Sequence, residues 1–206
     1  AKVRSFTKVK ILLATTNKGK IREHQYLLGG DGIQYTTLEE LGISKVPEET
    51  GDTCEENAIL KAKFYFEKSG GMPTMADDGG LEIQALNGEP GVHSRRWPGH
   101  EATDEELVSY AIEKMKDIPT EQRLAQLTVV LAIVSPTGET KVFSGALLGK
   151  IVEKPFYPIQ PGYPFRSIFQ ELQTGKILAE LPLEELPNSH RMQAVSAAIP
   201  YIRKIL

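Results

Sequence analysis

Two lysines lie at the beginning of the first predicted helix of the chain. Lys18 and Lys20 lie in the first turn, where the helix dipole already makes the environment positive. An anion held by the backbone N–H groups would explain both lysines, although two solvated surface lysines account for the pattern equally well. The candidate binding residues of this turn are Thr15, Thr16, Asn17, Lys18, Gly19 and Lys20.

The last predicted helix repeats this feature. Asn188 and Ser189 form the expected N-cap, and His190 and Arg191 occupy the first turn. An arginine can hold phosphate oxygens through two hydrogen bonds, and a histidine can donate one. The alternative is that these residues stand there by chance and that His190 is simply half buried. This alternative is weaker because two helix starts share the same unfavourable feature.

Two adjacent carboxylates, Asp77 and Asp78, stand at the end of a predicted strand beside Gly79 and Gly80. Neighbouring strand residues point to opposite faces, so only one is expected to enter a given cleft. The stretch Glu48-Glu49-Thr50-Gly51 could supply another carboxylate from a loop, and such hard oxygen ligands suit Mg²⁺. Each acidic pair alone is typical of a solvated turn. Together with cationic helix starts, they favour a site that binds a metal polyphosphate and polarises an attacking water.

The segment from residue 155 to residue 169 is rich in aromatic side chains. Five of them lie there with four of the 13 prolines, whereas an even spread would place about one aromatic residue in this window. A rigid loop with exposed rings could stack on a nucleotide base. A loop packed over the core is the alternative.

The composition bounds the class of protein. The 206 residues are 40% hydrophobic and 25% charged, which is usual for a folded globular chain. The sequence contains no apolar run long enough to span a bilayer. A net charge of −3 excludes a broadly basic surface for nucleic acid. We therefore expect neither a membrane nor a nucleic-acid partner.

Cys54 is the single cysteine of the sequence, which excludes an internal disulfide and predicts a reducing cytoplasm as the location. It begins a predicted helix, a position that lowers a thiol pKa. Since no histidine partner can be assigned, a nucleophilic role is a weak hypothesis. The four histidines show no metal-ligand spacing, which argues against a zinc site.

Strand and helix patterns alternate early in the chain and a hairpin follows, which favours an α/β fold with a mixed sheet. Residues 1–8 are interpreted as a flexible basic lead-in, and the capping box of Thr53 and Glu56 marks one helix start. Predicted strands cover residues 10–14, 73–76, 81–86, 127–134 and 140–152, an extended return covers 91–97, and helices cover 21–28, 54–70, 104–116 and 189–206.

These regions, in this order, resemble the pyrophosphatases of non-canonical purine nucleoside triphosphates, the inosine triphosphate pyrophosphatase family. The matching stretches are ILLATTNKGK (11–20), EETG (48–51), ENAILKA (56–62), ADDGGL (76–81), LNGEPGV (86–92) and SHR (189–191).

The resemblance implies an elongated mixed β-sheet flanked by helices, with two lobes and a central active-site cleft. It also implies Mg²⁺-dependent hydrolysis of ITP, dITP and XTP to the monophosphate and pyrophosphate. One domain over residues 1–206 would carry this activity, as part of a homodimer.

The family's roles are carried over by position. Asp78 is then the proton acceptor and a metal ligand, Glu48 is the second metal-site carboxylate, and Lys61 points into the phosphate site as a catalytic residue. The resemblance assigns nucleotide contacts to Thr15, Thr16, Asn17, Lys18, Gly19, Lys20, Gly79, Tyr163, Phe165, His190 and Arg191.

Three departures from the family pattern keep alternatives open. Gly79 stands where a serine is usual, Arg166 replaces an aspartate of the base-recognition loop, and Glu185 replaces a lysine. The same chemistry on another modified nucleotide is one alternative. A nucleotide-binding protein that has lost catalysis is the other.

Overall fold

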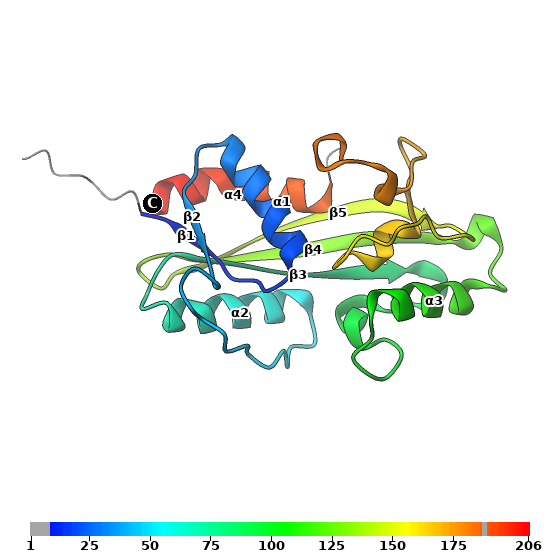
Figure 1. The fold of residues 1–206 in the computed structure, drawn as a ribbon, viewed down its shortest axis with the longest axis horizontal. Helices are drawn as coiled ribbons and strands as arrows, with labels where there is room; N and C mark the ends of the chain where they lie inside the picture. The colour runs from blue at the N-terminus through cyan, green and yellow to red at the C-terminus, as the bar shows by residue number, and fades with distance from the viewer. Residues whose placement is uncertain (1–8, 187–188) are drawn as a thin grey trace, which may run out of the picture.

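The computed structural model describes residues 9–186 and 189–206 (Figure 1). The predicted lead-in, residues 1–8, and Asn188 of the predicted N-cap lie outside the described residues. The helices are α1 (Lys18–Gly30), α2 (Cys54–Lys68), α3 (Asp104–Met115) and α4 (His190–Ile205), and the strands are β1 (Ile11–Leu13), β2 (Tyr35–Thr37), β3 (Thr74–Ile83), β4 (Leu124–Val134), β5 (Thr140–Ile151) and β6 (Phe169–Glu171).

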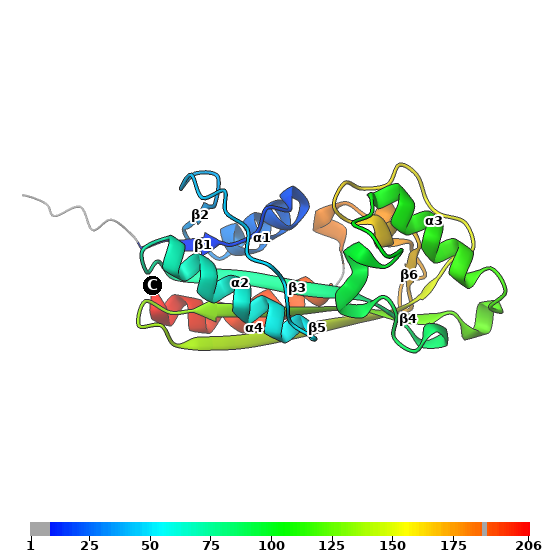
Figure 2. The same cartoon turned by 90° about the horizontal axis from the view of Figure 1, so that it is seen from below.

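The strands form one mixed sheet in the order β2-β1-β3-β4-β5-β6. β1 pairs in parallel with β2 and β3, whereas the pairs from β3 to β6 are antiparallel. α1 and α4 lie on one side of the sheet and α2 and α3 on the other, and the molecule is elongated along its long strands (Figure 1, Figure 2). The predicted α/β fold with helices flanking a mixed sheet is confirmed, while the two lobes stay a prediction.

Consecutive residues of β1 belong to two separate cores, because the side chains of a strand point alternately to its two faces. Ile11 and Leu13 are buried in one cluster with Val195 of α4, whereas Leu12 is buried in another with Ala58 of α2. The same alternation along β3 decides where its carboxylates point.

Side-chain caps fix the starts of the two helices on the α2 side of the sheet. Thr53 accepts from the N–H of Glu56 and the Glu56 carboxylate accepts from the N–H of Thr53, which confirms the predicted capping box. Thr103 and Glu106 form a second box at the start of α3. In the described part of the chain, no helix is long and apolar enough to cross a membrane.

The prediction that a strand stops at the Asp-Asp-Gly-Gly sequence is wrong. β3 continues to Ile83, and its residues 77 to 80 pair in register with β4. Two glycines resemble a turn in the sequence, but here they allow close backbone contacts. A Cβ atom on Gly79 would lie 2.2 Å from the Thr128 carbonyl oxygen, and one on Gly80 would lie 2.2 Å from the Gly91 carbonyl oxygen.

The segment after β3 is also less extended than predicted. Residues Gln84–Leu86 and Gly91–Arg96 form short 3-10 helices, so only residues 81–83 of the expected strand 81–86 are strand, as the end of β3, and the extended return 91–97 is not present. Asn87 between them has a left-handed backbone, as a tight turn requires. The reversal brings residues 92–96 back beside β3, where they line a pocket.

We expect Gly79→Ala to lower the free energy of unfolding by about 1–3 kcal/mol, because its Cβ would meet a backbone oxygen that cannot move independently of β4. Urea unfolding followed by circular dichroism measures the loss. Gly29→Ala in α1 is the matched control, since a Cβ there meets nothing within 4 Å. Equal stability of the two variants would contradict the close contact.

Candidate active site

A pocket of about 1040 Å³ lies where β3, α2, the start of α1 and the start of α4 approach one another. Its wall contains every site residue predicted from the sequence, although their roles stay predictions. These residues are Thr15, Thr16, Asn17, Lys18, Gly19, Lys20, Glu48, Lys61, Asp78, Gly79, Tyr163, Phe165, His190 and Arg191.

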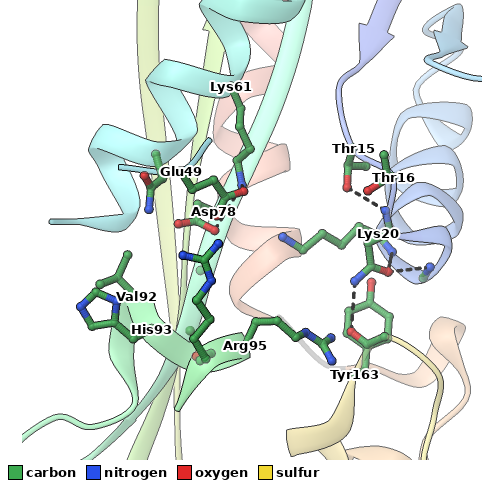
Figure 3. Close-up of a pocket in the computed structure, with 18 of the residues that line it drawn as sticks. Thr15, Thr16, Lys20, Glu49, Lys61, Asp78, Val92, His93, Arg95 and Tyr163 are labelled. Carbon is green, nitrogen blue, oxygen red and sulfur yellow. Dashed lines mark hydrogen bonds and ion pairs between the residues drawn. The ribbon is translucent and has the colours of Figure 1, made fainter. Parts of the chain in front are cut away.

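Asp78 and Lys61 form the acidic and basic pair on the α2 side of the sheet (Figure 3). The Lys61 Nζ lies 3.3 Å from Asp78 Oδ1 and 3.0 Å from Glu49 Oε1. Lys61 therefore bridges a strand carboxylate and a loop carboxylate. Sequence reasoning assigned Glu48 to the site, but it is the neighbouring Glu49 that reaches Lys61; the EETG stretch contained both candidates.

The environment of Asp78 suits a proton acceptor. Burial raises the pKa of this carboxyl, although the cations of Lys61 and Lys20 oppose the rise. Its Oδ2 atom is buried and has no hydrogen-bond partner among the described residues. A carboxylate with a raised pKa and an oxygen without a hydrogen-bond partner can accept a proton from water.

The charge of Lys61 is held in place by its two partners. Burial alone would lower the pKa of the ammonium group, but Asp78 and Glu49 more than offset this and raise it. Lys61 thus stays positively charged at neutral pH. It can attract an anion to the pocket while fixing the Asp78 side chain.

Asp77 points to the other face of the sheet, as the alternation predicts. Its carboxylate contacts Arg191 at 2.9 Å and Lys20 at 3.1 Å, and it lies 3.5 Å from His24 Nε2. Burial would raise the pKa of Asp77, but Lys20 and Arg191 hold it well below its ordinary value. One aspartate thus anchors the cationic starts of α1 and α4, which leaves the other for the pocket.

Glu23 is a second buried anchor, and sequence reasoning missed it. Its Oε2 atom accepts hydrogen bonds from Arg191 at 2.8 Å, Arg166 at 3.0 Å and the Tyr163 hydroxyl at 2.8 Å. Burial acts to raise the pKa of Glu23, yet these partners lower it to about 2. Its position three residues after Lys20, on the same helix face, was the available signal.

The start of α1 is capped by the side chain of its N-cap residue, Asn17. Asn17 Oδ1 accepts from the N–H groups of Gly19 and Lys20, at 2.9 and 3.2 Å. These two N–H groups were predicted to face an anion, but the cap already satisfies them. Positive charge at this end of the pocket therefore comes from side chains, and Lys20 points toward Asp78 (Figure 3).

His190 is not the cation that the sequence suggested. Burial, followed by the charge of Arg191, lowers its pKa to about 3, so the imidazole is neutral at neutral pH. Arg191 stays charged because Glu23 and Asp77 offset its burial. The His190 Nδ1 and Arg191 Nε atoms are buried and lack partners in the described part of the structure.

Part of the aromatic segment packs over the core, whereas Tyr157 is 65% exposed. Phe169 is fully buried, and Phe165 is 8% exposed with its ring edge against Trp97, at 6.3 Å between centroids. Tyr163 is the ring that remains part-exposed in the pocket. Arg166 is buried against Glu23.

Cys54 is not a reactive thiol in this fold. Burial raises its pKa to about 12, and the nearby Asp78 carboxylate adds to the rise. These effects outweigh the helix start, so the thiol is protonated at neutral pH. The weak hypothesis of a cysteine nucleophile gains no support.

The donor set fits a hard cation that takes only part of its coordination from protein. No group of three or more His, Cys, Asp or Glu residues that could hold a metal occurs within residues 9–186 and 189–206. The free Asp78 oxygen and the loop carboxylates of Glu48 and Glu49 nevertheless share one pocket. Mg²⁺ commonly binds one or two carboxylates, with waters and substrate phosphates completing its shell.

The fold and the pocket define a mixed-sheet α/β protein whose site sets carboxylates against cationic side chains. A model of the Ham1 family matches residues 11–201, and the chain belongs to this family.

Curated relatives and solved structures are similar over almost the whole chain. The dITP/XTP pyrophosphatase of Symbiobacterium thermophilum is 38% identical over 201 residues, which is 96% of each chain. A dITP/XTP pyrophosphatase of Thermus thermophilus is 40% identical over 192 residues, covering 93% of this chain and 90% of the relative. A HAM1 protein from Coxiella burnetii superposes with a TM-score of 0.80 at 34% identity, over 95% of this chain and 99% of that one.

We expect Glu23 to stabilise the fold by roughly 3 kcal/mol at neutral pH, since its pKa falls from 4.5 to about 2 on folding. A lowered carboxyl pKa gives stability that is complete above about 4.5 and is lost as the pH falls toward 2. Glu23→Gln should be less stable at pH 7 by a similar amount, with a difference that shrinks below pH 4.5. Urea unfolding of both proteins at several pH values measures this difference in the free energy of unfolding. A difference that does not change with pH would contradict the lowered pKa of Glu23.

Proposed function

We propose that this protein hydrolyses the deaminated purine nucleoside triphosphates ITP, dITP and XTP to the monophosphate and pyrophosphate. Membership of the Ham1 family and the names of the curated dITP/XTP pyrophosphatases support the reaction and the substrate class. The observation that carries the proposal is Asp78, which contacts the Lys61 cation through Oδ1 and has an unpartnered buried Oδ2, in a pocket with Lys20 and Arg191.

In the proposed reaction Asp78 takes a proton from a water molecule. The water oxygen forms a bond to the α-phosphorus, and the bond from that phosphorus to the bridging oxygen breaks, so pyrophosphate leaves with the electron pair. Lys61 holds Asp78 by one oxygen and leaves the other for the proton. Lys61 and Lys20 offset the negative charge that grows on the phosphate oxygens.

Mg²⁺ is part of the proposal, with Asp78 and Glu48 as the residues that would hold it and Glu49 beside them. When bound, the ion would neutralise phosphate charge and polarise the phosphoryl group. Assembly as a homodimer is proposed from the family resemblance alone, and a cytoplasmic location is proposed from the single cysteine of the sequence.

The unpartnered atoms at the start of α4 support a preference for 6-oxo purines. Arg191 Nε carries a proton and can only donate a hydrogen bond. Hypoxanthine and xanthine offer a carbonyl oxygen at position 6, whereas adenine offers an amino group that is itself a donor. A site that buries an unpaired donor therefore disfavours adenine.

A pyrophosphate-release assay over ITP, dITP, XTP, ATP, GTP and pyrimidine triphosphates, with Mg²⁺ and with EDTA, tests the proposal. We expect ITP, dITP and XTP to be cleaved faster than ATP, and EDTA to abolish release. Fast cleavage of only another nucleotide would support the same chemistry on a different base. Nucleotide binding with no release would indicate a protein that has lost catalysis.

We expect Asp78→Asn to lower kcat by about a hundredfold or more, because asparagine keeps the shape but cannot accept the proton. Circular dichroism should show a folded protein. Asp31→Asn, on the exposed surface at the end of α1, is the matched control and should keep normal turnover. Near-normal turnover of Asp78→Asn would move the role of proton acceptor to another residue.

A further inference from the structure

We infer that Arg166 is a positioning residue that fixes the Tyr163 ring as the aromatic wall of the base side of the pocket. The inference rests on the proposed function, since it concerns how the same site holds its nucleotide. It assigns a role to a position at which this chain departs from its family pattern.

Arg166 holds Tyr163 in two ways at once. Its guanidinium carbon lies 3.8 Å from the centroid of the Tyr163 ring, which is the distance of a stacked cation–π contact. Its Nη2 atom also donates to Glu23 Oε2, the same oxygen that accepts from the Tyr163 hydroxyl. Arg166 thus contacts the face of the ring, and Glu23, the counter-ion of Arg166, holds the ring hydroxyl.

The remaining freedom of the ring is removed by the start of α1. A Cβ atom on Gly19 would lie 2.5 Å from Tyr163 Cε2, so the ring edge rests against a residue without a side chain. The preceding peptide is held too, because Gly162 donates to Asp104 at 2.7 Å and accepts from Asn17 at 3.1 Å. Arg166 completes a set of contacts that leaves the ring one orientation.

The chemistry of these contacts requires arginine. A guanidinium is planar and can stack on a ring while its edge donates to a carboxylate, whereas an ammonium group cannot do both from one place. Arg166 is 7% exposed, so its positive charge would be costly to bury without the neighbouring carboxylate of Glu23. Without Arg166, Glu23 would keep Arg191, but the ring would lose its stacked cation, because Arg191 lies 5.8 Å from the ring centroid against 3.8 Å for Arg166.

The position of Tyr163 predicts which kinetic constant changes. Tyr163 lies across the pocket from Asp78 and Lys61, at the end where Arg95 approaches (Figure 3). A ring on the opposite side of the pocket from the reacting carboxylate is expected to contribute to binding of the base and not to proton transfer. Loss of its fixed orientation should therefore raise KM and leave kcat nearly unchanged.

The test measures kcat and KM for ITP, and the dissociation constant of ITP by calorimetry in EDTA, for four proteins besides wild type. These are Arg166→Gln, Arg166→Lys, Tyr163→Leu and the double variant Arg166→Gln with Tyr163→Leu. Arg166→Lys retains a cation for Glu23, so it reports on stacking if Arg166→Gln does not fold. Arg203→Gln is the control, because Arg203 is an exposed α4 arginine that pairs with Asp31 at 2.7 Å.

We expect both Arg166 variants to raise KM and the dissociation constant by about tenfold, with kcat within about twofold of wild type. Arg203→Gln should match wild type. In the Tyr163→Leu background, Arg166→Gln should have almost no further effect, because its role passes through the ring.

An equal effect of Arg166→Gln with and without the ring, or unchanged binding in both Arg166 variants, would overturn the inference while the proposed function stands. The calorimetry separates the two claims. A wild-type protein that binds ITP without hydrolysing it contradicts the proposed reaction but still permits the Arg166 comparison. A wild-type protein that neither binds nor hydrolyses ITP overturns both.

Discussion

The alternation of side chains along β3 is the constraint on which the rest of the site depends. Asp77 and Asp78 are neighbours in the chain, but they point to opposite faces of the sheet. Asp77 is enclosed by cations from α1 and α4, while Asp78 faces α2 and the pocket. If β3 slipped by one residue against β4, the two carboxylates would exchange faces, and each would lose its partners. The continuous pairing of β3 with β4 therefore specifies the site as firmly as the side chains do.

The buried charges on the α1 and α4 side act mainly to fix positions. Moving Arg191 out of water is costly, and its contacts with Glu23 and Asp77 offset that cost. What the contacts do provide is a defined geometry, because one guanidinium joins a helix, a strand and a second helix. The cationic wall of the pocket is therefore rigid before any ligand arrives, which reduces the entropy lost on binding.

Local signals in the sequence predicted much of this structure. The Thr53–Glu56 box, the hairpin of β4 and β5 and the long last helix are all determined by neighbours in the chain. The course of β3 through Gly79 was not predictable in this way, because only pairing with a distant strand turns a glycine pair into strand. Glu23 was missed for the same reason, because it acquires its role from residues that approach only in the folded chain. The sequence contained Glu48 and Glu49 but did not show which of them reaches Lys61.

Asn17 shows how narrow the choice at one position can become. Its amide oxygen caps α1, and its amide nitrogen donates to the Gly162 carbonyl, 145 residues further along the chain. An aspartate would keep the cap but has no proton to donate, and a serine is too short to do both. A side chain that is both acceptor and donor at fixed spacing thus ties the beginning of the first helix to a loop near the other end of the sequence. Sequence changes in that loop are therefore compatible with this contact only where the Gly162 carbonyl stays within hydrogen-bond distance of the Asn17 amide.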